Sequence, residues 1–417
     1  MTRSDQRLRL VVLCPHFAPD TAPTGEVISR IVEELVLLGH EVHVISALPW
    51  YSEHRIEPDW QPQGIRQWVR RERTEWGSIT RIHPFPGGDK KNLLRRAAGF
   101  VGFSVLAGAA SLRGGRVDAV IAMSPPLTLG LTGWLTHVVR RGPLVFNIQD
   151  VFPDAAVQTG AITDRRVIAA ARLLERVTYH RAAAITVLSE DLLANVAAKV
   201  KPSWRSRVHV IPNFVDTAFI TPGDRMTRYR NELGIGDEPV VMYAGNVGFS
   251  QSLELLIAAA RAMPEVAVVI NGDGAARVEL QRQAADLANV YFAGYQPKGR
   301  LSEVLATADL HVVPLRAGLG NVSVPSKTYS ILAAGRPVLA AIDAGTEVPR
   351  MLSASGGGRV VAPDREAEFI EAVRQLLTDP VALGAMGAAG RAWVEGAASP
   401  HAVAQAYEAL IRGLIAP

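Results

Sequence analysis

The sequence predicts an α/β protein of two domains, each a doubly wound parallel sheet, that face each other across a cleft. Three observations lead to this fold class. The chain has 417 residues, more than one hydrophobic core usually holds. Apolar runs of strand length alternate with amphipathic helical stretches through both halves. Glycine-rich turns follow several of the strands, and ligands bind at that end of the strands in such sheets.

Composition narrows the class of protein. Hydrophobic residues make up 48% of the chain and charged residues 20%, which is typical of a globular protein. The formal net charge of +4 is too small to indicate nucleic-acid binding. Cys14 is the single cysteine, so a disulfide framework and a cysteine-rich metal site are excluded, and a reducing cytosol is expected. We find no signal peptide and no apolar run of about 18 to 20 residues, the length that spans a bilayer.

A βαβ unit is predicted at the start of the chain. Residues 8–13 form a buried strand, a helix capped by Thr24 runs from about Gly25 to Leu38, and residues 41–46 form the next strand. This is the layout of a Rossmann-like half. The pattern G-x-G-x-x-G is absent, so a dinucleotide site is disfavoured. Gly25, at the start of the helix, could let a substrate phosphate approach the backbone or could simply form a tight turn.

Residues 50–96 are rich in tryptophan and arginine. From residue 65 to 96 the chain carries nine basic and three acidic residues, and residues 97–112 are apolar and uncharged. A basic flank followed by a short apolar helix is typical of a segment that lies on an anionic membrane surface. We therefore predict contact with the membrane surface through residues 65–112. The alternative is an ordinary buried helix beside a solvated basic face. Nucleic-acid binding is disfavoured because no nucleic-acid motif accompanies these residues.

The remainder of the first half continues the alternation. Strands are predicted at 117–126, 144–154, 182–189 and 208–216, with helices at about 165–180 and 191–198. The second of these strands leads into a loop that carries Asp150 and Asp154. A proline-containing link follows at about 214–222. We therefore expect an N-terminal domain at 1–215, a C-terminal domain at 216–398, and a helix at 399–417 that packs back on the N-terminal domain.

The second half repeats the pattern. Strands are predicted at 239–245, 266–270, 289–295, 309–315, 338–341 and 359–363, with helices between them. The turn GNVG (245–248) comes at the end of the first of these strands, and NGDG (271–274) follows the second. Both turns lie where parallel sheets bind their ligands.

The stretch from Val322 to Ala341, VSVPSKTYSILAAGRPVLAA, indicates an anion site. Ser326 is a reasonable N-cap for a short apolar helix, and Lys327 lies in its first turn. A lysine there opposes the helix dipole. A lysine at this position becomes favourable if an anion binds at the start of the helix. The N–H groups, the helix dipole and the ammonium would then all attract that anion. The alternative is a solvated lysine on a loop.

The ordered segments resemble the nucleotide-sugar domain of GT-B glycosyltransferases. They are VVMYAGNVGFSQSLELLIAAA, VVINGDG, NVYFAGY, ADLHVVPL and VPSKTYSILAAGRPVLAA. With FAPDTAPTG, LLGHEVHVISALPWY, SPP and NIQDVFPDAAVQTGAI, nearly the whole chain is similar to the bacterial colanic-acid and O-antigen type of glycosyltransferase family 4. The segment 52–100 is the least specific part. The resemblance implies a retaining transferase that moves a hexosyl or N-acetylhexosaminyl group from a UDP or GDP sugar, bound by the C-terminal domain, to an acceptor hydroxyl held by the N-terminal domain.

The resemblance also implies residue roles. The donor-binding set is Gly25, Asn246, Gly248, Gln251, Gly272, Asp273, Gly274, Gly294, Tyr295, Ser326, Lys327, Ser330 and Glu347. The acceptor-binding set is Trp50, Ser124, Asp150 and Asp154. Relatives often carry a histidine that contacts the donor sugar where Ser124 stands, so the resemblance leaves the identity of the sugar open.

Two departures from the family pattern bear on the donor site. Many relatives carry two glutamates eight positions apart, the second of which holds the ribose; here Val322 and Ser330 stand there, and Glu347 or Ser330 could substitute. Asn246 and Gln251 replace an arginine and a lysine of the phosphate loop. The charges of the donor must then depend more on Lys327, on helix N-termini and on Arg316.

The implied mechanism stabilises the leaving diphosphate. Lys327 and N–H groups near Gly25 and Ser326 would bind the growing negative charge. Asp150 would orient or deprotonate the acceptor hydroxyl, although it could instead cap a helix or hold a loop. Glu347 is a further catalytic candidate. We expect no metal and no other cofactor, because the chain has no Asp-x-Asp motif and no histidine cluster.

The acceptor is expected to be a lipid-linked glycan, which would place the protein in the cytoplasm on the inner face of the membrane.

Other functions remain open at this point. A nucleotide-sugar 2-epimerase and a non-catalytic sugar-nucleotide-binding subunit are the alternatives. An NAD-dependent oxidoreductase is disfavoured by the absent dinucleotide motif.

Overall fold

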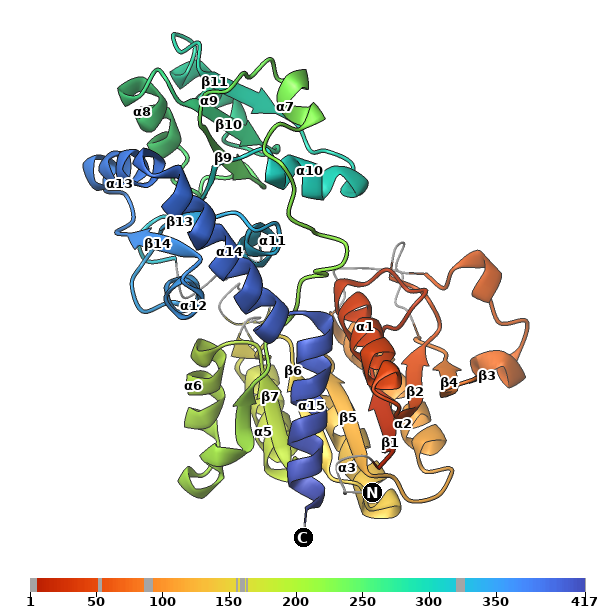
Figure 1. Ribbon diagram of the computed structural model, residues 1–417. Coiled ribbons are helices and arrows are strands. Elements are labelled where there is room, and N and C mark those ends of the chain that lie inside the picture. The colour runs from red at the N-terminus through yellow and green to blue at the C-terminus, as the bar shows by residue number, and fades with distance from the viewer. Residues whose placement is uncertain are drawn as a thin grey trace. The chain divides into compact units, whose positions relative to one another are not determined.

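A computed structural model describes residues 6–51, 55–85, 93–154, 157, 162, 164–319 and 327–416, apart from the side chains of residues 93–97. The chain divides into two compact units (Figure 1). Unit 1 comprises Met1–Asn213 with Val403–Pro417, and unit 2 comprises Phe214–Ala402. Each unit is an α/β domain with its own sheet, which confirms the predicted fold class.

Unit 1 is built, among the described residues, on an eight-stranded sheet, here called sheet A. Its strand order is β3-β4-β2-β1-β5-β6-β7-β8, and every neighbouring pair is parallel except β3 with β4. The central strands are almost wholly buried, as expected when helices cover both faces. The strands are β1 (Arg9–Leu13), β2 (Glu41–Ala47), β3 (Val69–Thr74), β4 (Gly77–Ile82), β5 (Ala119–Ser124), β6 (Leu144–Ile148), β7 (Ala184–Val187) and β8 (Val208–Val210).

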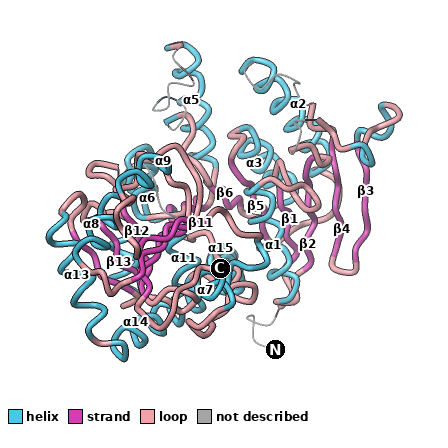
Figure 2. Tube along the Cα trace, turned by 90° about the horizontal axis from the view of Figure 1, so that it is seen from above, coloured by secondary structure: helices cyan, strands magenta, loops and turns pink. Residues whose placement is uncertain are grey.

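Helices lie on both faces of sheet A. Figure 2 shows α2 (Leu93–Ser111), α3 (Thr128–Arg140) and α5 (Arg165–Arg181) on one face, and α1 (Pro23–Leu37) and α15 (Pro400–Ile415) on the other. A further helix, α6 (Glu190–Lys199), packs beside β7 and β8. On the α2–α3–α5 side the sheet buries one hydrophobic core, to which these helices contribute Phe103, Leu129 and Tyr179.

The C-terminal helix is held to sheet A by buried polar groups. Asn147 of β6 donates to the Tyr407 hydroxyl of α15 at 2.7 Å and to the Thr186 hydroxyl of β7 at 3.1 Å. The neighbouring Phe146 points to the opposite core. This alternation along β6 gives the sheet one apolar and one partly polar face.

Two features of unit 1 differ from the sequence predictions. Thr24 is not the cap of the first helix, because α1 begins at Pro23 and Ala22 occupies the N-cap position. Proline suits a first helical position, since its φ is fixed and it has no N–H to satisfy. In addition, β3 and β4 form an antiparallel hairpin that was not predicted. The charged residues of β3 obscured its alternation of exposed and half-buried side chains.

Unit 2 is built on a six-stranded parallel sheet, here called sheet B, as far as the chain is described. Its order is β11-β10-β9-β12-β13-β14. The strands are β9 (Val240–Ala244), β10 (Ala267–Asn271), β11 (Val290–Ala293), β12 (Leu310–Pro314), β13 (Val338–Ala341) and β14 (Gly358–Val361). The helices are α7 (Arg228–Glu232), α8 (Glu254–Ala262), α9 (Arg277–Gln283), α10 (Leu301–Ala306), α11 (Lys327–Ala333), α12 (Glu347–Ser355), α13 (Glu366–Thr378) and α14 (Pro380–Ala397).

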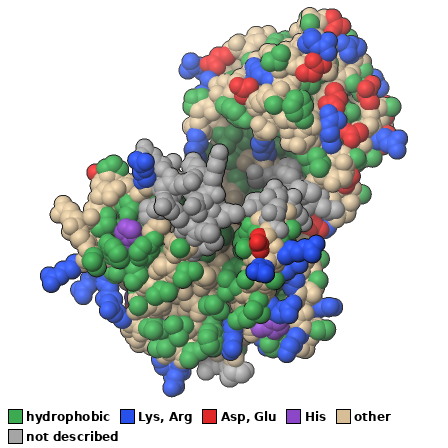
Figure 3. Space-filling view, turned by 180° about the vertical axis from the view of Figure 1, so that it is seen from behind, with side chains coloured by type: hydrophobic (Ala, Val, Ile, Leu, Met, Phe, Trp, Pro, Cys, Tyr) green, Lys and Arg blue, Asp and Glu red, His purple; other side chains and the backbone are tan. Residues whose placement is uncertain are grey.

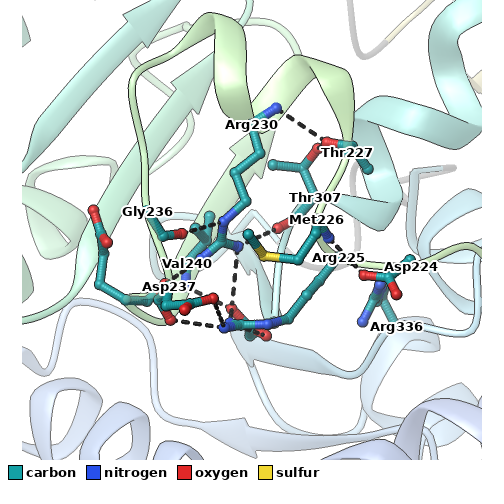
Figure 4. A network of polar contacts seen from close by, with 12 residues as sticks. Asp224, Arg225, Met226, Thr227, Arg230, Gly236, Asp237, Val240, Thr307 and Arg336 are labelled. Carbon is teal, nitrogen blue, oxygen red and sulfur yellow. Dashed lines mark hydrogen bonds and ion pairs between the residues drawn. The ribbon is translucent and has the colours of Figure 1, made fainter.

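A buried polar network joins the amino ends of β9 and β12 (Figure 4). The fully buried Arg230 donates to the carbonyls of Gly236 at 2.7 Å and Thr307 at 3.2 Å, and also to that of Glu238. Asp309 accepts from the Val240 N–H at 2.8 Å and from the Arg225 guanidinium at 3.0 Å. Because the network lies at the edge opposite the glycine turns, we assign it to folding and not to the ligand site.

Candidate functional site

Three glycine turns meet at the carboxyl edge of sheet B. In the register of the parallel strands, Ala244 pairs with Asn271, and Asn271 pairs with Ala293. Gly245, Gly272 and Gly294 each follow one of these paired residues directly. The turns predicted from the sequence are therefore brought side by side, at the edge where such sheets bind ligands.

Close backbone packing explains the glycines. A Cβ at Gly272 would overlap the carbonyl oxygen of Gly245, and a Cβ at Gly274 would overlap that of Val247. Hydrogen bonds tie the two loops, from the Gly245 N–H to Asn271 at 2.7 Å and from the Val247 N–H to Asp273 at 2.9 Å. The two loops form a surface on which a ligand can approach the backbone closely.

Lys327 lies beside Gly245. A Cβ added to this glycine would overlap the lysine Nζ, which lies 5.4 Å from the centroid of the Tyr243 ring. Burial of the ammonium lowers the pKa of Lys327 below its usual range. In the described part of the chain, no carboxylate forms an ion pair with Lys327. A half-buried cation without an acidic partner is well suited to bind an anion, which would restore the stability of its charged form.

The phosphate-loop candidates are partly engaged within their own loop. The Gly248 N–H donates to the Gln251 side-chain oxygen at 3.1 Å, while Asn246 is exposed and its carbonyl accepts from the Tyr243 hydroxyl at 2.6 Å. Gln251 thus stabilises the loop conformation. Arg316, considered as a further phosphate ligand, donates to the Phe249 carbonyl at 2.7 Å and pairs with Glu254 at 2.7 Å. Its charge is already compensated.

The remaining donor candidates surround the same edge. The Gly274 N–H donates to the Asp273 carboxylate at 2.8 Å, and the exposed Tyr295 donates to the Asp273 carbonyl at 3.3 Å. Ser330 lies one turn after Lys327 on α11. Glu347 begins α12 and pairs with Arg350 at 3.2 Å, so it offers a shared carboxylate. Ser326 and Val322 lie outside the described residues.

A second group of candidates lies at the carboxyl edge of sheet A. Trp50, Ser124 and Asp150 follow or end the parallel strands β2, β5 and β6, and Gly25 lies in the first turn of α1. Asp150 is exposed, and its carboxylate has no hydrogen-bond partner within the described residues. Ser124 is fully buried, and no described group bonds its hydroxyl.

Asp154 does not belong with this group. Its carboxylate pairs with Lys199 at 2.7 Å and accepts from Asn195 at 3.3 Å. Burial raises the pKa of Asp154, but these two partners outweigh burial and leave its pKa below the ordinary value. We conclude that Asp154 holds its loop against α6.

The sequence analysis missed a histidine at this edge. His16, in the loop after β1, bonds the buried Asp20 carboxylate at 2.7 Å. Its ring stacks on Trp50 with centroids 5.4 Å apart, and a Cβ on Gly25 would come within 2.9 Å of the His16 Cβ. A histidine positioned by a carboxylate is able to move a proton. The only sequence signal was the pair of residues four apart in PHFAPD.

An arginine of unit 2 was also missed. Arg277 follows the NGDG turn and donates to the carbonyl of Ala293 at 2.9 Å and to that of Gly272. It thereby joins the carboxyl ends of β10 and β11.

Within the described residues, no cluster of three or more histidine, cysteine or acidic side chains could hold a metal ion. Cys14 follows β1, and burial raises the pKa of its thiol to about 12, so it is not a nucleophile at neutral pH.

Two family models match the chain. A model described as a glycosyl transferase 4-like domain matches residues 24–213, and one described as glycosyl transferases group 1 matches residues 238–379. Among curated relatives, the putative colanic acid biosynthesis glycosyl transferase WcaI of Escherichia coli is 26% identical over 388 residues, which cover 89% of this chain and 93% of the relative. The probable glycosyltransferase WbjE of Pseudomonas aeruginosa is 26% identical over 343 residues, with 79% and 84% covered.

Solved structures share the fold. Sucrose-phosphate synthase from Thermosynechococcus elongatus matches with a TM-score of 0.66 at 18% identity, with 98% of this chain and 99% of that chain covered. HepE from Anabaena, in complex with UDP and glucose, matches with a TM-score of 0.60 at 14% identity, with 98% and 100% covered. At such low identity these likenesses establish the fold alone.

Proposed function

The chain belongs to the GT-B glycosyltransferases of family 4, and from that premise we propose that it transfers a sugar from a UDP or GDP sugar to a lipid-linked glycan, with retention at the anomeric carbon. The pathway would be the synthesis of a bacterial surface polysaccharide. The names of the relatives WcaI and WbjE support that assignment, and the UDP bound to HepE supports a nucleotide-sugar donor.

One observation carries the donor site. Lys327 is half-buried beside Gly245 and has no acidic partner among the described residues. A diphosphate placed there would pair with the ammonium. The N–H groups of these glycine turns already donate within the fold, so the ammonium would be the main group that stabilises the negative charge as the glycosidic bond breaks.

The acceptor side has two candidates for handling the proton of the acceptor hydroxyl. Asp150 offers an exposed carboxylate, and His16 offers an imidazole held by Asp20. In a retaining transfer the leaving phosphate can itself accept the proton, and Asp150 would then orient the hydroxyl. A lipid-linked acceptor would hold the enzyme at the inner surface of the cytoplasmic membrane.

Calorimetric titration with UDP, GDP, ADP and dTDP tests the proposal. We expect one nucleotide to bind tightly to the wild-type protein. A charge-assisted hydrogen bond contributes about 1.5–3 kcal/mol, so Lys327→Ala should weaken that binding by about 10- to 150-fold. Arg374→Ala removes a positive charge from the exposed side of α13, where Arg374 pairs with Glu371 at 3.2 Å, and should leave the affinity unchanged. If no nucleotide binds, the donor site and the proposed function are both wrong.

A further inference from the structure

The α2–α3–α5 layer of unit 1 has an apolar outer surface. Of the 19 large hydrophobic side chains that are exposed among the described residues, eight lie on these three helices. They are Val101, Val105, Leu135, Val138, Val139, Val167, Leu173 and Val177. Single exposed apolar residues are normal, but such a concentration on one layer is typical of an interaction surface. Figure 3 shows apolar side chains gathered on this face of unit 1.

The same layer has almost no negative charge. Glu175 is the only acidic residue within the three helices, and it is buried and paired with Lys199 at 2.7 Å. By contrast, α5 alone carries Arg165, Arg166, Arg172, Arg176 and Arg181.

Three of these arginines line a surface hollow of about 530 Å³, together with Ile168 and Leu173. They are Arg165, Arg172 and Arg176. In the described part of the chain no carboxylate pairs with any of the three. The exposed Asp164, the residue before Arg165, caps the first turn of α5 by accepting from the N–H groups of Arg166 and Val167. Asp154 interacts electrostatically with Arg172, so the hollow presents a net positive charge beside apolar side chains.

We propose that the outer face of α2, α3 and α5 binds the surface of an anionic lipid bilayer. Apolar side chains would enter the boundary between headgroups and acyl chains, and the arginines of α5 would contact lipid phosphates. None of the described helices is long and apolar enough to cross a bilayer, so the contact would be with the surface only. The inference deepens the proposed function, on which it rests for the lipid-linked acceptor, by identifying the surface that meets the membrane.

This face differs from the segment that the sequence favoured. Arg81 of β4 is almost fully buried, pairs with Glu72 at 2.6 Å and lies over the Trp60 ring. Arg71 and Arg73 point outward from the edge strand β3, where charges prevent pairing with another strand. Arg81 therefore has a role within the fold, Arg71 and Arg73 protect a sheet edge, and in the described part of the predicted segment 65–112 only α2 belongs to the proposed surface. The predicted basic side chains of Lys90, Lys91, Arg95 and Arg96 lie outside the described part of the chain.

The charge pattern also argues against a second copy of the chain as the occupant. A two-fold symmetric dimer through this face would bring the same patch of each copy together. Arginines would then face arginines without a compensating acid, which is unfavourable. An anionic bilayer provides the complementary charge.

Vesicle flotation tests the proposal with two matched variants. The wild-type protein should float with vesicles of phosphatidylcholine and phosphatidylglycerol at 70:30, but not with phosphatidylcholine alone. Each basic residue near an anionic surface contributes roughly fivefold. Arg165→Glu/Arg172→Glu/Arg176→Glu should therefore weaken binding by at least about 100-fold. Arg66→Glu/Arg71→Glu/Arg73→Glu changes the net charge equally in the β3 region and should have a much smaller effect.

A third variant tests insertion of the apolar side chains. In 0.5 M NaCl the attraction between the arginines and the anionic lipids is screened. Val105→Ser/Leu173→Ser should weaken the vesicle binding that persists under these conditions. Chemical denaturation of every variant serves as the folding control, because the substitutions lie in unit 1, and nucleotide titration checks that the donor candidates of unit 2 are unaffected. If nucleotide binding fails in the wild-type protein while flotation succeeds, the proposed function is wrong but the surface is supported.

Three results would overturn the proposal. The first is that the wild-type protein fails to float with anionic vesicles. The second is that the two triple variants lose binding equally. The third is that the wild-type protein is a dimer which the α5 variant converts to a monomer with vesicle binding unchanged.

Discussion

Gly245→Ala provides a sharp test of the donor site, because the new methyl group would occupy the position of the Lys327 ammonium. The added Cβ would overlap the lysine Nζ and also lie 2.8 Å from its Cδ. The lysine must therefore leave its place beside the Tyr243 ring. We expect nucleoside diphosphate binding to weaken about as much as in Lys327→Ala, by about 10- to 150-fold.

The double variant Gly245→Ala/Lys327→Ala separates this mechanism from general damage. The three atoms nearest to the added Cβ all belong to the lysine side chain, so the Lys327→Ala background removes the closest overlaps of the methyl group. We expect Gly245→Ala to have little further effect on binding there, so that the two substitutions are strongly non-additive.

Stability provides the second readout of this cycle. The φ of Gly245 is +158°, a conformation that L-residues rarely adopt, so the substitution should cost about 1 kcal/mol or more of folding stability in both backgrounds. Gly384→Ala, in the helical interior of α14 where a Cβ meets nothing within 4 Å, is the matched control and should stabilise by about 0.5–1 kcal/mol. Equal losses of affinity in the wild-type and Lys327→Ala backgrounds would refute the role of Lys327.

Three further predictions concern stability and the ribose site. Arg230→Met should lower the free energy of unfolding by about 3–5 kcal/mol in chemical denaturation, because it leaves buried carbonyls without their donor and removes one of the two arginines beside Asp309. The exposed Arg228→Met should change it by less than about 1 kcal/mol. Equal effects of the two substitutions would contradict the network of Figure 4. Burial lowers the pKa of His311 to about 4, below its value in the unfolded chain. The neutral His311 therefore contributes fully to the free energy of unfolding above about pH 6.5. This contribution is lost as the pH falls toward 4, by about 3 kcal/mol in total. The pH dependence of unfolding should therefore be shallower over this window in His311→Gln, and an unchanged slope would show that another group titrates. If Glu347 holds the ribose, the nucleotide that binds should be preferred over its 2′-deoxy analogue. The preference should be only about tenfold, because the Glu347 carboxylate also pairs with Arg350. In calorimetry Glu347→Gln should remove most of this preference, and an unchanged preference would leave Ser330 as the candidate.

The strands and the donor edge could be predicted because their signals are local. Strands covered on both faces appear in the sequence as continuous apolar runs, as β10 does. The glycines directly after β10 indicate the edge of the sheet at which a ligand binds. The position of Lys327 at a helix start could also be predicted from neighbouring residues. Its proximity to Gly245 could not, because that contact depends on how two loops 82 residues apart in the sequence pack at one sheet edge.

Other features required the packing itself. The bond between His16 and Asp20 depends on the course of an irregular loop, which residue spacing does not define. The hairpin of β3 and β4 was hidden because charged residues on an edge strand weaken the apolar alternation. In α2 the apolar positions looked like those of any core helix. Only the arrangement of α2, α3 and α5 in one layer shows that their outer sides are left uncovered.

The environment of each cation, more than the net charge, indicates what it can bind. Arg230 and Arg277 each donate to several backbone carbonyls, so they are satisfied within the fold and are unavailable to a ligand. Lys327 differs from both, because burial weakens its charged form and no described acid compensates it. A diphosphate would relieve that cost, and the favourable change would be largest when negative charge concentrates on the leaving group. A lysine is better suited to this task than an arginine, because its compact ammonium on a flexible stem can follow the charge as it develops.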